Sequence, residues 1–186
     1  MLKKDFDNMQ LSLGIKVVGV NEPTCMNAVN FALDLLDHKL PASIKKLIHG
    51  TEVEIVTGAI ESGALTNAEE KKITLDAKKN ELSLVEAENL LVKVNILRAG
   101  DWVKALTFAK NEPWSCLTYQ LVHEFGHLID GISSGDSYNR LSPKLSPTKY
   151  GSTSSSESFA ENFAYWIFDL DIDSKASRVI ESLLHS

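Results

Sequence analysis

The stretch "LVHEFGHLID", residues 121–130, places two histidines and a glutamate in a segment that is otherwise mostly apolar. If residues 115–132 form a helix with about 100° per residue, their apolar residues fall on one broad arc that must face a core. That arc contains Leu117, Leu121, Val122, Phe125, Leu128, Ile129 and Ile132. His123 and His127 lie together on the opposite side, one turn apart, with about 5–6 Å between their Cβ atoms.

Two imidazoles in this arrangement can reach one cation at Zn–N distances of about 2.0–2.1 Å. Glu124 is offset by about a quarter turn, where it can contact a water on that cation without ligating it. This is the His-Glu-x-x-His pattern, which supplies two ligands and a general base from one helix. The alternative is a surface helix with two solvated histidines. Gly126 costs a helix interior about 1 kcal/mol relative to Ala, which suggests that another backbone approaches closely there.

A catalytic zinc ion usually takes three protein ligands and keeps one position open. Ser154 and Glu157 form a capping-box pattern that opens a second helix, expected to run to about Leu170. Glu157 and Glu161 lie one turn apart on that helix. One of them can ligate the metal and the other can orient an imidazole, and spacing alone leaves both assignments open.

Two further carboxylates follow the histidines. Asp130 lies about one turn beyond His127 on the same helix, so it is better placed to hold an imidazole N–H than to bind the metal. Asp136 is another acidic candidate in the connection that follows.

Composition narrows the class of protein. The 186 residues are 44% hydrophobic and 24% charged, which is typical of a folded globular domain. The net charge of −6 and pI near 5.4 argue against nucleic acid as the main partner. No apolar run is long enough for a membrane span, and no signal peptide is visible. We therefore expect a cytoplasmic protein, a protein exported by a signal-independent route, or a mature secreted form. Cys25 and Cys116 are expected to be buried or semi-buried thiols.

The rest of the chain predicts an α+β fold, organised as a single domain over 1–186. A sheet-bearing part covers 1–110, and a helical part over 111–186 carries the metal site. Strands are expected at 11–20, 51–58 and 71–78, with a loop or short edge segment over 59–70 around Gly63. Helices are expected from Pro23 onward and at 43–48, 83–98, 115–132, 154–170 and 173–184. Residues 133–156 should form a long irregular connection, and connections of that length are usually functional.

The segment 121–130 and the later segment 150–164 also resemble a known family. "HEFGHLID" followed by "YGSTSSSESFAENFA" resembles the catalytic domain of anthrax toxin lethal factor and the bacterial Pro-Pro endopeptidases, which are zinc metallopeptidases. The resemblance is dense over 121–130 and 150–164 and thin elsewhere. It implies a zincin-like fold, in which a small mixed sheet packs on the His-Glu-x-x-His helix and a helical part follows.

The resemblance also implies roles for individual residues. Glu157 would complete the zinc site, Tyr150 would hydrogen-bond the tetrahedral oxyanion, and Glu161 would support a histidine ligand. Ser154 to Ser156 stand where the family often has Asn, Pro or acidic residues. That departure leaves Glu161 as an alternative ligand.

These residues together indicate a zinc-dependent endopeptidase that acts on a peptide or protein substrate. Zinc on His123, His127 and Glu157 would activate a water, Glu124 would take its proton, and Tyr150 would stabilise the oxyanion.

One alternative is an intracellular regulatory metallopeptidase of the ImmA/IrrE type, which the lack of an export signal favours. Another is a binding module that keeps the fold without catalysis. Non-haem iron also suits two histidines and a carboxylate, but it would not need a neighbouring glutamate base. Oligomeric state and cleavage specificity do not follow from these patterns.

Overall fold

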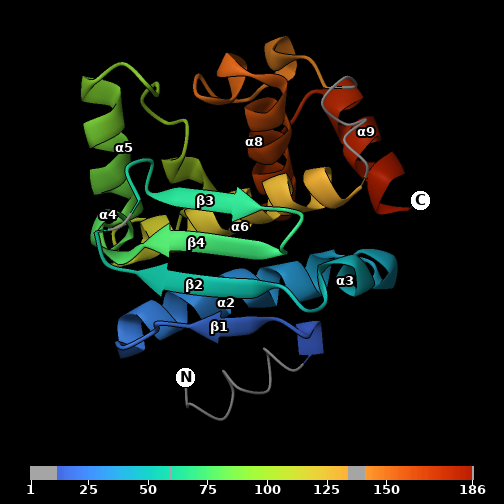
Figure 1. Ribbon diagram of the computed structural model, residues 1–186. Coiled ribbons are helices and arrows are strands. Elements are labelled where there is room, and N and C mark those ends of the chain that lie inside the picture. The colour runs from blue at the N-terminus through green and yellow to red at the C-terminus, as the bar shows by residue number, and fades with distance from the viewer. Residues whose placement is uncertain (1–11, 59, 134–140, 186) are drawn as a thin grey trace.

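A computed structural model describes residues 12–58, 60–133 and 141–185 of the chain. It is a mixed α+β structure in which a four-stranded sheet packs against helices (Figure 1). The strands are β1 (Lys16–Val18), β2 (Glu52–Val56), β3 (Ala64–Asn67) and β4 (Lys72–Asp76). The α-helices are α2 (Pro23–Lys39), α3 (Ala42–Ile48), α4 (Ala77–Asn80), α5 (Leu84–Lys93), α6 (Ser115–Ile132), α8 (Ser155–Ile167) and α9 (Ser174–Leu184). Three 3-10 turns are η1 (Val103–Leu106), η2 (Pro143–Leu145) and η3 (Gly151–Thr153).

The sheet has the strand order β1-β2-β4-β3. β1 and β2 are parallel, as are β2 and β4, whereas β3 is antiparallel to β4 and forms one edge. Val53 of β2 is in register with Ile73 of β4, and both are fully buried. Because side chains alternate along a strand, the neighbouring positions face the other way. There Lys72 pairs with Glu54 at 2.8 Å on the polar outer face.

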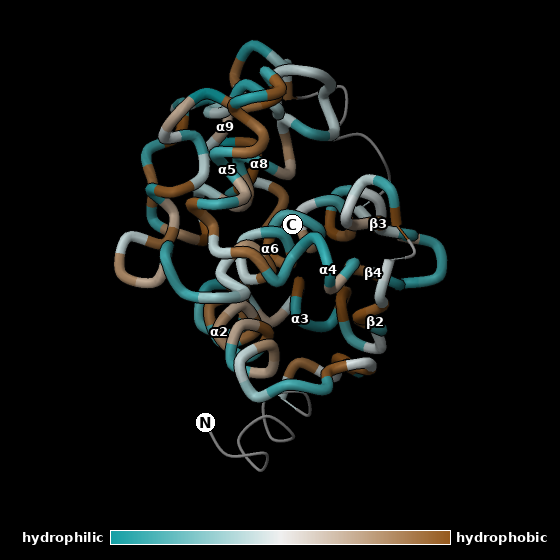
Figure 2. The backbone as a smooth tube through the Cα atoms, turned by 90° about the vertical axis from the view of Figure 1, so that its left-hand side faces the viewer, coloured by the Kyte–Doolittle hydropathy of each residue, from teal (hydrophilic) through white to brown (hydrophobic). Residues whose placement is uncertain are grey.

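The helix α6 lies at the centre of the molecule. It contacts β3 and β4 on one side, α2 on another and α8 on a third. Figure 2 shows the strands on one side of α6 and α5, α8 and α9 on the other. His123 and Asp130, on the side of α6 opposite the apolar arc, are both buried. The alternative of a surface helix with two solvated histidines is therefore wrong, because α8 packs against α6.

The close approach expected at Gly126 is confirmed. A Cβ atom at this position would lie 2.9 Å from the Cα atom of Ala160 in α8. Real Cβ atoms essentially never approach another atom so closely, so glycine is what allows the two backbones to meet. Cys25 and Cys116 are free and buried, as expected.

Backbone conformation explains where the element bounds differ from the expected ones. The strand predicted over 11–20 is confined to Lys16–Val18, because Gly14 and Gly19 on either side take positive φ angles of 65° and 81°. The helix predicted over 83–98 ends at Lys93, and Asn95 follows with a φ of 64°. A left-handed residue just after a helix terminates it.

The same mechanism shortens α8. The helix predicted to run to Leu170 ends at Ile167, and Asp169 has a φ of 56°. The segment 59–70 contains the edge strand β3 rather than only a loop. The connection predicted over 133–156 holds η2, η3 and the start of α8, and its residues 134–140, including Asp136, lie outside the described part of the chain.

One hydrophobic cluster includes residues from both predicted parts of the chain, from Leu13 to Leu184. Within the residues that the structure describes, no helix has the length and apolar character needed to cross a membrane. The fold thus brings α6 and α8 together beside the edge strand β3, and this junction positions the candidate site.

Candidate metal centre

Three side chains from α6 and α8 meet at one point. Nε2 of His123 and Nε2 of His127 are 3.1 Å apart. Oε2 of Glu157 lies 3.2 Å from the first nitrogen and 3.3 Å from the second. Two histidines four positions apart and a glutamate thirty positions further along the chain therefore place three donor atoms at the corners of a nearly equilateral triangle.

This triangle has the size of one face of a tetrahedral metal site. A tetrahedral ion with ligands at about 2.0–2.1 Å separates its ligand atoms by about 3.3–3.4 Å. Oε2 of Glu157 is buried, and its polar neighbours include the two imidazole Nε2 atoms, which is the environment of a ligand atom rather than of a solvated acid. Two imidazole nitrogens and one carboxylate oxygen also form a donor set that suits zinc.

The other nitrogen of each imidazole has its own partner. Nδ1 of His123 lies 2.9 Å from Oε1 of Glu161, and Nδ1 of His127 lies 3.0 Å from the hydroxyl of Ser156. These contacts turn both Nε2 atoms toward Glu157. Such partners fix the tautomer and the ring orientation of metal-binding histidines.

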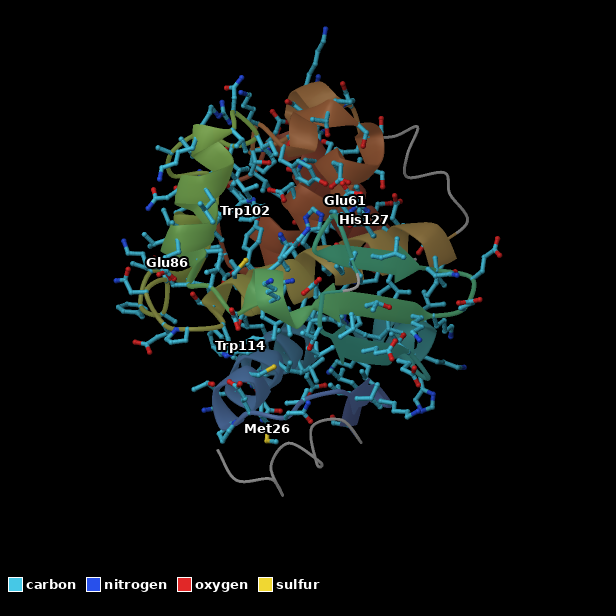
Figure 3. The ribbon with its side chains drawn as sticks, turned by 60° about the vertical axis from the view of Figure 1, so that its left-hand side comes forward. Met26, Glu61, Glu86, Trp102, Trp114 and His127 are labelled. Atoms are coloured by element: carbon cyan, nitrogen blue, oxygen red, sulfur yellow. The ribbon has the colours of Figure 1, made fainter. Side chains whose placement is uncertain are left out.

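Glu161 is held in turn by two aromatic side chains. Its Oε2 accepts a hydrogen bond from the hydroxyl of Tyr119 at 2.9 Å and one from the indole Nε1 of Trp102 at 3.3 Å. Glu161 is fully buried, and the burial and the Glu161 charge raise the pKa of Tyr119 well above its usual value. Tyr119 therefore stays a donor. Trp102 lies between α5 and the histidine-bearing part of the molecule (Figure 3).

Glu124 is held from the other side by the edge strand. Its Oε2 accepts a hydrogen bond from the hydroxyl of Thr66 in β3 at 2.6 Å. His123, Glu124 and His127 offer ligand atoms within 4.8 Å of one another, so this group can hold a metal ion. Oε2 of Glu157 lies within the same limit of both imidazole nitrogens, at 3.2 and 3.3 Å.

Tyr150 lines the same space on the loop before α8. Its ring centroid lies 6.1 Å from that of His123. Burial, together with the carboxylate of Glu157, raises the pKa of Tyr150 above its usual range, so its phenol stays protonated and can donate. The next residue, Gly151, allows the loop to pass against Glu161, since a Cβ there would lie 2.9 Å from the Cγ atom of Glu161.

The Tyr150 loop is attached to the turn before η1. Oδ2 of Asp101 accepts a hydrogen bond from the backbone N–H of Lys149 at 2.9 Å. Arg98 donates to the carbonyl oxygen of Pro147 at 3.1 Å and pairs with Asp101. The Asp101 carboxylate is buried, whereas the Arg98 side chain that pairs with it is 62% exposed.

The same turn is fixed to α5 by Glu88. The carboxylate of Glu88 accepts from the backbone N–H groups of Gly100, Trp102 and Val103 at 2.7, 2.6 and 2.9 Å. One turn therefore supports Tyr150 through Asp101 and the His123–Glu161 pair through Trp102.

The electrostatics of the three donors are those of an ion-paired cluster. Burial lowers the pKa of His123, but the carboxylates of Glu157 and Glu161 outweigh this and raise it to about 10. Burial raises the pKa of Glu157, but both imidazoles outweigh this and lower it well below its usual range.

Asp130 is the other carboxylate that was predicted to lie beside the histidines. Asp130 is fully buried near the end of α6. The Nδ1 atoms of the two histidines face Glu161 and Ser156, and a role of Asp130 beside an imidazole stays a prediction.

The site lies in a hollow of about 700 Å³, which we call the cleft. One wall is the edge strand β3 with Ala64, Leu65 and Thr66, and the floor is α6 with both histidines. The remaining walls include Trp102, Tyr150 and Glu157. Glu61, on the loop before β3, also lines the cleft, as does His127, and both are labelled in Figure 3.

Comparisons with known proteins found no match. No family model matches the chain, and no curated protein or solved structure matches it significantly. Any functional assignment therefore depends on the geometry of the site.

Several residues of this arrangement were not identified from the sequence. They are Thr66, Glu88, Asp101, Trp102, Tyr119 and Ser156. Only two of them have a position in the sequence that could have pointed to the site. Ser156 belongs to the serine cluster just before Glu157, and Tyr119 stands four residues before His123 on the same helix. The others lie far away in the chain and become neighbours only through the fold.

Proposed function

We propose that this protein is a zinc-dependent endopeptidase with His123, His127 and Glu157 as metal ligands. The observation that carries the proposal is the triangle of donor atoms with edges of 3.1, 3.2 and 3.3 Å. Three protein ligands leave the fourth position of a tetrahedral ion open, as in catalytic rather than structural zinc sites. Bound zinc supplies a Lewis acid that polarises a carbonyl group and lowers the pKa of water toward about 7.

Glu124 acts as the general base. Its carboxylate lies beside the ligands, and the hydrogen bond from Thr66 at 2.6 Å holds it in one orientation. In that position it can accept a proton from the attacking water and pass the proton to the leaving amine. The contact with Thr66 uses one carboxylate oxygen, and the other remains available for the proton.

Tyr150 donates a hydrogen bond to the oxyanion that forms as the carbonyl carbon becomes tetrahedral. Its raised pKa keeps the phenol protonated through the neutral range. Donors that meet developing charge in this way contribute about 10²–10³ in rate.

A peptide suits the cleft better than a small substrate. β3 is an edge strand, so the side facing away from β4 has unpaired backbone groups. An extended peptide can bind such an edge as an added strand. The cleft runs beside β3 and the histidines together, so a peptide bound to this edge would pass the metal site.

The zincin-like fold and a kinship with lethal factor and the Pro-Pro endopeptidases belong to the same proposal. They are supported by a mixed sheet with an antiparallel edge strand, packed on the helix that carries the histidines and followed by a helix that carries Glu157. The sequence likeness over 121–130 and 150–164 agrees with this order of elements.

The test is the Glu124→Gln variant in a peptide-library digest, run with and without chelator and read by mass spectrometry. The variant should bind zinc as the unchanged protein does and lose turnover by about 10²–10⁴, the contribution typical of general acid–base catalysis. Glu112→Gln changes an exposed glutamate outside the cleft and should cleave normally.

Two outcomes would oppose the proposal. Normal cleavage by Glu124→Gln would remove the assignment of the base. A chain that binds zinc at His123, His127 and Glu157 but cleaves no peptide would be a binding module instead.

A further inference from the structure

A second hollow adjoins the cleft on the side of α5. It has a volume of about 720 Å³ and lies between the loop before β3, the helix α4 and the helix α5. Leu91, Trp102 and Gln120 line both spaces. The two hollows therefore form one continuous groove, which begins at the metal ligands and extends toward the start of α6.

The walls of the second hollow are largely apolar. They include Ile60, Leu82, Ala87, Leu90, Leu91 and Trp102. Leu90 is 52% exposed although it faces this hollow. Leu65 and Ile96, which line the cleft, are also large hydrophobic residues that remain exposed. Exposed apolar side chains that gather along a groove mark a surface that a ligand covers.

The buried polar groups of this hollow already have partners. Asp76 accepts from the backbone N–H groups of Gly58 and Ile60 at 3.2 and 3.3 Å. The amide of Asn80 donates to the carbonyl oxygens of Gly63 and Asp76 at 2.9 Å. Glu61, Lys78, Lys79 and Gln120 also line the hollow, but the hydrocarbon surface of its walls exceeds their polar surface. The hollow therefore suits an apolar side chain better than a polar one.

The position of the hollow along α6 sets which substrate residue it would receive. Gln120 and Cys116, which line it, stand three and seven residues before His123. These separations correspond to about 4.5 and 10.5 Å along a helix axis. An extended peptide that follows the groove alongside α6 advances about 3.3 Å per residue, so a side chain in the hollow would belong to the second or third residue from the cleaved bond.

We propose that the second hollow is a specificity pocket that binds a large apolar side chain of the peptide substrate, two or three residues to one side of the cleaved bond. This inference rests on the proposed peptidase function and names the substrate class for the same groove. Leu90 and Ala87 are its specificity-determining residues, because both line the second hollow and neither lines the cleft with the metal ligands.

The experiment compares pairs of peptides that are identified first by a library digest with the zinc-loaded protein. In each pair, a Leu or Phe at the second or third position from the cut is replaced by Ala. The unchanged protein should cleave the apolar member about tenfold or more faster in kcat/KM, in the range that hydrophobic pockets achieve. Leu90→Glu should reduce this ratio toward one, because it places a charge in the pocket.

Val94→Glu is the matched control. Val94 is 65% exposed next to the same helix and lines neither hollow, so this variant should keep the preference of the unchanged protein. Ala87→Phe, which fills the hollow, should lower cleavage of the Leu and Phe peptides and spare the Ala peptides. Zinc content should be equal in all four proteins.

The results separate the two proposals. Cleavage by the unchanged protein without an apolar preference at these positions would overturn the pocket and leave the peptidase intact. An apolar preference that Leu90→Glu and Ala87→Phe both retain would have the same meaning. If the unchanged protein cleaves no peptide of the library in the presence of zinc, the peptidase proposal fails and the pocket fails with it.

Discussion

Nδ1 of His123 lies 2.9 Å from Oε1 of Glu161, deep in the protein, and this contact turns Nε2 of the same ring toward Glu157. The carboxylate of Glu161 has two further bonds, from Tyr119 and Trp102, so its position does not depend on the metal. The site is therefore partly organised before any ion binds.

Glu161→Gln should weaken zinc binding although it removes no ligand. The neutral amide loses the charge that favours His123 as a donor, and its NH₂ group meets donors instead of acceptors. We expect about a 10–100-fold loss of zinc affinity, the effect typical of removing a partner of a ligating histidine. Competition with a chromophoric chelator measures it. Glu181→Gln, an exposed change on α9, is the control, and equal affinities for both variants would contradict a role for Glu161.

Asp101→Asn should impair turnover while zinc binding stays normal. Asp101 holds the backbone of Lys149 beside Tyr150 and touches no metal ligand in the described contacts. A small displacement of the Tyr150 loop would misplace its hydroxyl, and such shifts cost about 10²-fold in rate.

A double-mutant cycle separates this positioning role from general destabilisation. If Asp101 acts through Tyr150, then Asp101→Asn in a Tyr150→Phe background should lower kcat little further. Fully multiplicative losses, or a parallel loss of zinc affinity, would show that Asp101 acts by another route.

Gly126→Ala should destabilise the protein. Alanine favours a helix by about 1 kcal/mol over glycine, but its Cβ would lie 2.9 Å from the Cα atom of Ala160 and 3.2 Å from Phe163. Overpacking of this kind costs about 1–3 kcal/mol. Urea denaturation followed by circular dichroism measures the change in free energy of unfolding.

The contact at Gly126 is with a backbone atom, which yields a second expectation. Ala160→Gly should not restore the stability of Gly126→Ala, because the Cα atom remains in place. A Gly126→Ala protein as stable as the unchanged one would show that α6 and α8 can move apart at no cost.

Asp76→Asn should destabilise the protein only where the carboxyl group is ionised. Burial raises the pKa of Asp76, but hydrogen bonds from Gly58, Ile60 and other backbone N–H groups outweigh it and lower the pKa below its usual value. A lowered pKa in the folded state stabilises the fold above the unfolded-state pKa of about 3.9. That stabilisation is lost as the pH falls through the folded-state value.

The variant should therefore be less stable than the unchanged protein at pH 7 by about 2 kcal/mol, the net size of hydrogen bonds to a charged group. The difference should narrow as the pH is lowered below 4. Urea titrations at pH 7 and at pH 3.5 measure it, and a difference that grows toward low pH would have the wrong sign for this account.

The parts of the fold that follow from local patterns were predictable. The apolar period places α6 at Ser115–Ile132, the capping box of Ser83 and Glu86 starts α5, and Ser154 caps α8. Gly126 indicated the approach of another backbone because glycine destabilises a helix interior relative to alanine. The ends of β1, α5 and α8 were not predictable in the same way. They depend on positive φ angles at residues such as Asn95 and Asp169. In other sequences the same residue types often have negative φ angles, so the residue type alone does not predict the end of the element.

The site, too, has residues that local patterns predict and residues that they do not. His123, Glu124 and His127 share one helix, so their spacing alone identifies them as a set. Spacing left Glu157 and Glu161 open as ligand and partner, and only the crossing of α8 over α6 places Glu157 beside both Nε2 atoms. Thr66 and Asp101 come from a strand and a turn whose positions relative to α6 no local pattern encodes.

Anomalous diffraction at the zinc edge, from crystals of the zinc-loaded protein, tests the central claim most directly. The account predicts one strong peak about 2.0–2.1 Å from Nε2 of His123, Nε2 of His127 and Oε2 of Glu157, with no bond to Glu124. A peak coordinated by Glu124 in place of Glu157, or no peak between the two histidines, would contradict it.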